Sequence, residues 1–281
     1  MQAANSRRWG MINNMGFELD CESKEYVFHS LCEGFTCGPD SLKNILLELD
    51  LEKIYQENGD NIYIPSEEYL YNYIVKRLGN HKPLKVVNWF HLTRTTKQTE
   101  FNDGIIPLGD SLEKIWSALI DIAPDVVIKD NLKLLRQSGV PNHLYGIKHN
   151  NPFHWGPYAV LIKETAFRSS IQHDYLGMPE IIEDICNGYE EKYGESIINI
   201  YESSLVPKIV KFKSNKRVDA GCIEAALYYA YEAVRGNPPS SNCITCFDSE
   251  GVKIEPESIV SVITVEILPQ QKQSSRSLRS G

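Results

Sequence analysis

The sequence lacks the long apolar run of a membrane protein: no stretch approaches the ~18 consecutive apolar residues that a transmembrane helix needs. The opening residues, MQAANSRRWGMINN, contain no apolar core of a secretory signal, so we expect a cytoplasmic protein. A hydrophobic content of 42% with 23% charged residues is ordinary for a globular protein. The 281 residues suffice for one large domain, or for one domain with an appendage.

Motifs that bind phosphate or metal are also scarce. No Gly-x-Gly-x-x-Gly follows a strand and no Walker loop occurs, which argues against a Rossmann or P-loop nucleotide site. The seven cysteines, an odd number, indicate reduced thiols. Cys243 and Cys246 form a CxxC pair, but a structural zinc would need two more ligands, and only Cys32 and Cys37, at a loose spacing, are available. Buried thiols explain these cysteines better, and zinc stays an open alternative.

Charge is distributed unevenly along the chain. Residues 17–60 hold eleven acidic and three basic side chains, an excess of acid equal to the net charge of −8 of the whole chain. Residues 207–217 carry five basic side chains and no acidic one. Such a run is typical of a solvated strand edge, and a patch that contacts nucleic-acid phosphates is the alternative. The five basic residues are Lys208, Lys211, Lys213, Lys216 and Arg217.

Hydrophobic periodicity predicts three parts of the chain. Residues 1–83 form an acidic, mainly helical region, in which residues 41–58 and 66–78 each have an apolar face and the first forty residues have little pattern. Residues 84–268 alternate strands with helices. The polar residues 269–281 predict a disordered tail.

The middle part is expected to be an α+β domain with a mixed sheet, because its strands are short and its helices few. The segment 208–213 alternates like a half-exposed strand. The expected strands are 86–92, 158–162, 208–213, 244–247 and 259–267, and the expected helices are 110–123, 179–191 and 223–234.

Three clusters of polar residues compete for the functional site. They are His91 with Thr93 and Arg94; His154–Tyr158; and Gln172–Tyr175 with Pro179–Asp184. Polar groups at the end of a buried strand are costly unless they are satisfied, so the first cluster suggests a binding site. A core histidine bonded to a neighbouring carbonyl, with a surface arginine, is the alternative.

A strand histidine, a tyrosine on a neighbouring strand and a glutamate suit a site that breaks a sugar–base bond. The histidine and tyrosine would hold a nucleotide, and an arginine would pair with its phosphate. The carboxylate would stabilise an oxocarbenium-like centre or take a proton from the acceptor.

These residues resemble a known family. The histidine of FHLTR, the downstream GIIPL, the GPY that opens a strand and the IEPESI segment before the last strand are similar to the NAD-dependent ADP-ribosyltransferase fold. The nearest forms are bacterial toxins and RNA 2′-phosphotransferases. The resemblance covers about residues 86–267 and implies a mixed, split β-sheet with flanking helices.

The resemblance also implies a function: transfer of ADP-ribose from NAD to a protein or nucleic acid, in a toxin or defence role. The candidate NAD-binding residues are His91, Thr93, Arg94, Tyr158 and His173, and the candidate catalytic residues are Glu180, Glu183 and Tyr158. The strand at 244–247 has no glutamate at its start, so Glu180, Glu183 and Glu250 compete for the catalytic role. Glu180 is preferred because it follows a polar loop, and an ordinary helix-dipole partner is the alternative.

Two other functions stay open. A metal-dependent hydrolase or nuclease would use His91, His154, His173, Asp174 and Glu180, although His173-Asp174 lacks the spacing of a His-Glu-x-x-His pair. A non-catalytic interaction protein would bind a basic partner through its acidic N-terminal region. The sequence specifies neither the acceptor nor the oligomeric state.

Overall fold

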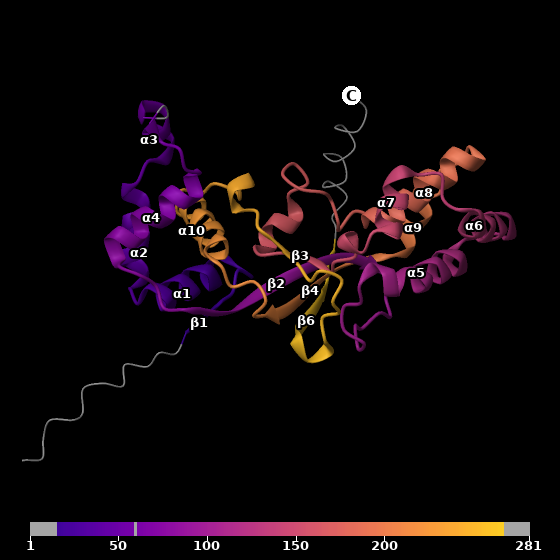
Figure 1. The fold of residues 1–281 in the computed structure, drawn as a ribbon, viewed down its shortest axis with the longest axis horizontal. Helices are drawn as coiled ribbons and strands as arrows, with labels where there is room; N and C mark the ends of the chain where they lie inside the picture. The colour runs from indigo at the N-terminus through magenta and orange to yellow at the C-terminus, as the bar shows by residue number, and fades with distance from the viewer. Residues whose placement is uncertain (1–15, 59–60, 267–281) are drawn as a thin grey trace, which may run out of the picture. The chain divides into compact units, whose positions relative to one another are not determined.

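The computed structural model describes residues 16–58 and 61–266, and the predicted tail at 269–281 lies outside them. The described residues combine helices with a six-stranded sheet, so the α+β class expected from the sequence is confirmed (Figure 1). In this part of the chain no helix is long and apolar enough to cross a membrane.

The elements follow one another along the chain with short connections. The helices are α1 (Lys24–Phe35), α2 (Pro39–Glu48), α3 (Leu51–Asn58), α4 (Ser66–Leu78), α5 (Leu108–Ile122), α6 (Val126–Ser138), α7 (His143–Asn150), α8 (Glu180–Tyr193), α9 (Ile198–Ser204) and α10 (Ala220–Val234). The strands are β1 (Phe17–Leu19), β2 (Leu84–Thr95), β3 (Tyr158–Val160), β4 (Val206–Ser214), β5 (Cys246–Asp248) and β6 (Ile259–Thr264).

The described chain divides into two compact units. Unit 1 holds the residues up to Asn88 together with Ser214–Cys243, and unit 2 holds Trp89–Lys213 together with the residues from Ile244 onward. The predicted boundary after residue 83 is close to the first crossing, but the assignment of residues 220–234 to the second part is wrong. Helix α10 packs on α1, α2 and α4 in unit 1 (Figure 1).

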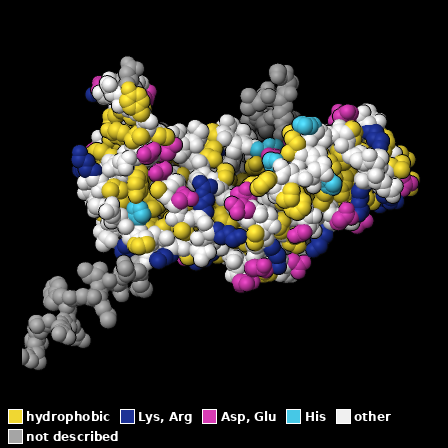
Figure 2. Space-filling model, viewed as in Figure 1, with side chains coloured by type: hydrophobic (Ala, Val, Ile, Leu, Met, Phe, Trp, Pro, Cys, Tyr) yellow, Lys and Arg dark blue, Asp and Glu magenta, His cyan; other side chains and the backbone are white. Residues whose placement is uncertain are grey.

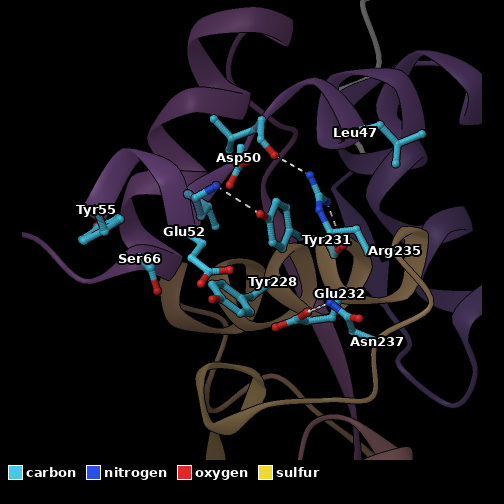
Figure 3. Close-up of a pocket in the computed structure, with 12 residues that line it drawn as sticks. Leu47, Asp50, Glu52, Tyr55, Ser66, Tyr228, Tyr231, Glu232, Arg235 and Asn237 are labelled. Atoms are coloured by element: carbon cyan, nitrogen blue, oxygen red, sulfur yellow. Dashed lines mark hydrogen bonds between the residues drawn. The ribbon is translucent and has the colours of Figure 1, made fainter. Parts of the chain in front are cut away.

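In unit 1, the C-terminal end of α10 contacts the junction between α2 and α3. The Tyr231 hydroxyl accepts a hydrogen bond from the backbone N–H of Leu51, at 3.1 Å. The Arg235 guanidinium lies 3.6 Å from the centre of the Tyr231 ring and donates to the carbonyls of Leu46 and Leu49 (Figure 3). These carbonyls belong to the turn where α2 ends. The single helix predicted at 41–58 is therefore two helices, because α10 satisfies the backbone groups that the break exposes.

All six described strands belong to one mixed sheet. Its order is β5-β3-β2-β4-β6, and β1 pairs with the first part of β2. The β1–β2 pair is parallel, whereas the pairs β2–β3, β3–β5 and β4–β6 are antiparallel. Strand β2 therefore has neighbours along both edges. Trp89 and Phe90 are both fully buried, and because successive side chains of a strand point to opposite faces, both faces of β2 are covered here.

Strand β4 is more buried than the sequence suggested. Its central residues are buried on both faces, so the half-exposed strand predicted at 208–213 is wrong. The Lys208 ammonium, only 2% exposed, donates to the carbonyls of Thr96, at 3.1 Å, and Lys97, at 3.2 Å. The Lys211 ammonium lies 5.9 Å from the centre of the Phe90 ring. Both lysines are part of the packing of the sheet.

Unit 2 contains two apolar cores. The larger is formed by α5 to α9, with Trp116, Ile185 and Tyr201 almost fully buried. The smaller lies on the sheet and includes Phe90, Leu92 and Val160. A cavity described below takes lining residues from both.

Candidate functional site

A cavity of about 900 Å³ opens in unit 2, and residues of all three polar clusters line it. Its volume is within the range of cofactor sites, about 300–1,000 Å³. The end of β2, the loop before β3 and the start of α8 each contribute, although they are far apart in the chain. The polar lining residues from the clusters are His91, Thr93, Arg94, His154, Trp155, Tyr158, Gln172, His173, Tyr175 and Glu180.

The apolar wall of the cavity is built by two motifs that meet. Ile105 and Ile254 exchange backbone hydrogen bonds of 2.9 and 3.0 Å, which joins the GIIPL segment to the start of IEPESI. Gly104 has a φ of +81°, and a Cβ there would collide with the Ile254 carbonyl oxygen. Glycine is therefore required at this position. The wall presents Ile105, Ile106 and Leu108 to the cavity.

His91 lies at the end of β2 with one ring nitrogen occupied. Its Nδ1 is 2.7 Å from the backbone oxygen of Tyr158 on the neighbouring strand. A carbonyl oxygen only accepts, so Nδ1 carries the proton and Nε2 keeps a free lone pair. Burial lowers the pKa of His91, against the effect of this hydrogen bond. His91 is therefore bonded to a neighbouring carbonyl, as the alternative of a core histidine supposed. It also lines the cavity.

Tyr158 lines the cavity with its hydroxyl already engaged. The side chain is 42% exposed, and the hydroxyl donates to the Phe153 carbonyl at 2.9 Å. Burial and the nearby charges of Asp248 and Glu180 raise the pKa of Tyr158. A protonated hydroxyl that already donates is poorly suited to acid–base work, so the geometry does not favour Tyr158 as a proton-transfer group.

Glu180 is the predicted glutamate that faces the cavity. It begins α8, and its Oε1 accepts from the Tyr175 hydroxyl at 3.2 Å. Burial acts to raise the pKa of Glu180, but the ammonium of Lys148 beside it outweighs burial and the pKa lies below its ordinary value. Within the described residues Glu183 and Glu250 do not line the cavity. Oε2 of Glu183 instead lies 3.7 Å from Nε2 of His173.

One residue of the site, Lys148, was missed in the sequence. The Lys148 ammonium bridges Glu180 Oε2, at 3.0 Å, and Asp184 Oδ2, at 2.7 Å. Asp184, which belongs to the third polar cluster, is only 3% exposed. A lysine on a weakly patterned segment gave no signal, and only the i, i+4 spacing of Glu180 and Asp184 places the two acids on one helix face.

The third cluster divides between lining and support. His173 lines the cavity, with its ring centre 4.7 Å from that of Tyr175 and its Nε2 3.2 Å from the Met178 carbonyl. The Asp174 carboxylate instead accepts from the backbone N–H of Gly177 at 2.9 Å, which closes a turn. Asp174 therefore shapes the loop that carries His173.

Arg94 does not have the role predicted for it. Although it borders the cavity, its guanidinium is 8% exposed and donates to backbone carbonyls. The acceptors are the oxygens of Leu205 at 3.1 Å, Leu176 at 3.0 Å, Gly177 at 2.8 Å and Glu202 at 2.6 Å. Four of its five N–H groups are thus committed to the fold. We assign Arg94 to the fold, where it ties the loop at 176–177 and the C-terminal end of α9 to β2, and not to a phosphate.

The basic run at 207–217 does not present its five cations together. Lys208 and Lys211 are buried, whereas Lys213 and Lys216 are exposed. Arg217 forms an ion pair with Asp219, at 3.1 Å. On the face shown in Figure 2, Lys and Arg side chains are scattered among acidic ones. Because they are buried, Lys208 and Lys211 are not available to contact nucleic-acid phosphates, as the alternative interpretation of this run required.

The hypothesis of a metal centre gains no support from the geometry. Among the described residues, no group of three or more His, Cys, Asp or Glu side chains is arranged to hold a metal ion. This applies to the set of His91, His154, His173, Asp174 and Glu180, and equally to the cysteines. Burial raises the pKa of Cys32 to about 12, so this thiol stays protonated.

Comparison of the chain with protein-family models, curated proteins and solved structures finds no match.

Proposed function

We propose that unit 2 binds NAD in this cavity and transfers ADP-ribose to a macromolecular acceptor. The observation that supports the proposal is convergence: His91, Tyr158 and Glu180 come from distant stretches of chain and line one cavity of about 900 Å³. These are three of the four side-chain types that the resemblance to ADP-ribosyltransferases implies; the fourth, the arginine, has no counterpart in Arg94, whose guanidinium is bound to backbone carbonyls. A cavity of this size is suited to a dinucleotide.

Glu180 is the proposed catalytic carboxylate. In the reaction, the bond between ribose C1′ and the nicotinamide nitrogen breaks, and its electron pair leaves with nicotinamide. A lone pair of the acceptor forms the new bond at C1′, and the acceptor proton passes to a base. Positive charge develops on the ribose before the new bond is complete, and a nearby ionised carboxylate stabilises it. The lowered pKa of Glu180 keeps it ionised at neutral pH.

The proposed roles of the other residues are in binding. The free Nε2 of His91 accepts a hydrogen bond from a ribose hydroxyl or from the carboxamide of nicotinamide, and the neighbouring Thr93 adds a hydroxyl. The exposed ring of Tyr158 stacks on nicotinamide, with its orientation fixed by the bond to Phe153. His173, next to Tyr175 in the lining, borders the same part of the cavity.

The test is release of nicotinamide from labelled NAD, with transfer of label to cell extract as the second readout. Glu180→Gln keeps the size of the side chain and removes its charge, so we expect the rate to fall by about 100-fold or more. The matched control is Glu191→Gln, an exposed glutamate on the same helix, which should keep the wild-type rate. No release by the wild type, or equal rates for wild type and Glu180→Gln, would reject the proposal.

A further inference from the structure

The cavity wall beside Glu180 contains a buried group of charges. Lys148 is in the last turn of α7, and its side chain is 17% exposed. Its ammonium lies between Glu180, 37% exposed at the cavity, and Asp184, whose side chain is 5% exposed behind it. The backbone of Lys148 is itself fixed, because its carbonyl accepts from the Trp155 indole at 3.0 Å. The ammonium therefore has a defined position.

This arrangement of charges is expected to lower the free energy of unfolding. Two carboxylates four residues apart on a helix repel one another, and Lys148 and Asp184 lose most of their contact with water. Burial raises the pKa of Asp184 in spite of the lysine beside it. An apolar trio of similar size would fill the same space. Buried charge groups in a cavity wall are typical of functional sites.

We infer that Lys148 is a positioning residue: anchored by Asp184, it holds the Glu180 carboxylate in the orientation that faces the cavity. This inference rests on the proposed function, in which Glu180 acts on the ribose. Lys148 occupies Oε2 of Glu180 and Tyr175 occupies Oε1, so both oxygens are fixed. Each oxygen retains one lone pair that is not used by these partners.

Other titratable groups surround the carboxylate and must be considered in any pH experiment. They are Lys148 from α7, Asp184 from α8, His173 and Tyr175 from the preceding loop, and Tyr158 from β3. Of these, Lys148 and Asp184 are the pair whose removal changes the charge next to Glu180 without removing a residue proposed to contact NAD.

The test compares Lys148→Met, Lys148→Arg and Asp184→Asn, with the exposed Lys133→Met on α6 as the control. We expect kcat for NAD turnover to fall about tenfold or more in Lys148→Met, with KM for NAD within about twofold of wild type. The acid limb of the kcat profile should move to higher pH, because the carboxylate loses its cation. Lys148→Arg should restore most of kcat, Asp184→Asn should give an intermediate loss, and Lys133→Met should match wild type.

A second readout does not depend on turnover. The ¹³C-carboxyl resonance of Glu180, assigned by its absence in Glu180→Gln, reports its pKa directly. This pKa should rise in Lys148→Met and return toward wild type in Lys148→Arg. If the wild type does not consume NAD, the proposed function fails while the titration still decides whether Lys148 holds the carboxylate. A Glu180 pKa and a kcat unchanged in Lys148→Met would overturn the inference; if that variant does not fold, unchanged values in Asp184→Asn would do so.

Discussion

At the scale of single residues, the protonation of His91 has the clearest consequence. Its Nδ1–H is committed to the Tyr158 carbonyl, so the ring can act in the cavity only through Nε2. Protonation of Nε2 would remove this acceptor and place a cation in a partly apolar site. Burial opposes that charge and lowers the pKa of His91 from its ordinary value.

This shift predicts a pH dependence of stability. Between the lowered pKa of His91 and the ordinary value near 6.5, the unfolded chain binds more protons than the folded chain. The free energy of unfolding should therefore rise with pH through this window, so that the contribution of His91 is complete above about pH 6.5 and is lost as pH falls through the window. His91→Gln cannot titrate, so denaturant unfolding of this variant should depend less steeply on pH. Equal slopes for His91→Gln and wild type would show that the histidine titrates as it does in water.

Single residues also show how far the sequence predicts the site. His91, Tyr158 and Glu180 were selected from local pattern, and the structure places all three in one cavity. The role of Arg94 was wrong, and Lys148 was missed. Both depend on partners supplied by distant segments. The sequence does not distinguish an arginine whose guanidinium is bound to four carbonyls from one whose guanidinium can bind a phosphate.

At the scale of elements, strongly periodic segments were predicted well. Helices α4, α5, α8 and α10 lie close to their expected positions, because each carries a continuous apolar face. Helices α1, α6 and α7 were not recognised as regular helices. Helix α7 buries a single tyrosine and shows no amphipathic stripe, so tertiary packing selects it. Helices α1 and α6 do carry buried apolar residues at helical spacing, and this spacing was overlooked.

The junction of GIIPL with IEPESI is the element on which the shape of the cavity depends. Gly104→Ala would place a methyl group against the Ile254 carbonyl and demand a positive φ from alanine. We expect it to lower the free energy of unfolding by about 3 kcal/mol. It should also reduce the rate of NAD turnover, since the wall at Ile105 and Ile106 would have to shift. Denaturant unfolding measures the first effect.

The matched control for this prediction is Gly194→Ala. Gly194 has a φ of +75°, similar to that of Gly104, and lies in the left-handed helical region, but nothing lies within 4 Å of the position its Cβ would take. This variant should lose about 1 kcal/mol, from backbone strain alone. Equal losses in the two variants would contradict a close contact between the two motifs.

At the scale of the whole molecule, the chain leaves unit 1, builds unit 2 and returns to supply α10 to unit 1 before completing unit 2. All residues that line the cavity belong to unit 2. The proposed chemistry is therefore assigned to unit 2 alone. Unit 1 has its own hollow of about 670 Å³, beside Asp50, Glu52 and Tyr228 (Figure 3), to which we assign no role.

The central claim is that three distant segments form one binding site for NAD. Amide hydrogen exchange with and without saturating NAD tests it most directly, because peptides from each segment are read separately. We predict slower exchange in residues 89–95, 154–160 and 172–182 together, with little change in α1, α2 and α4. Unchanged exchange in all three segments, or protection of only one of them, would contradict the account.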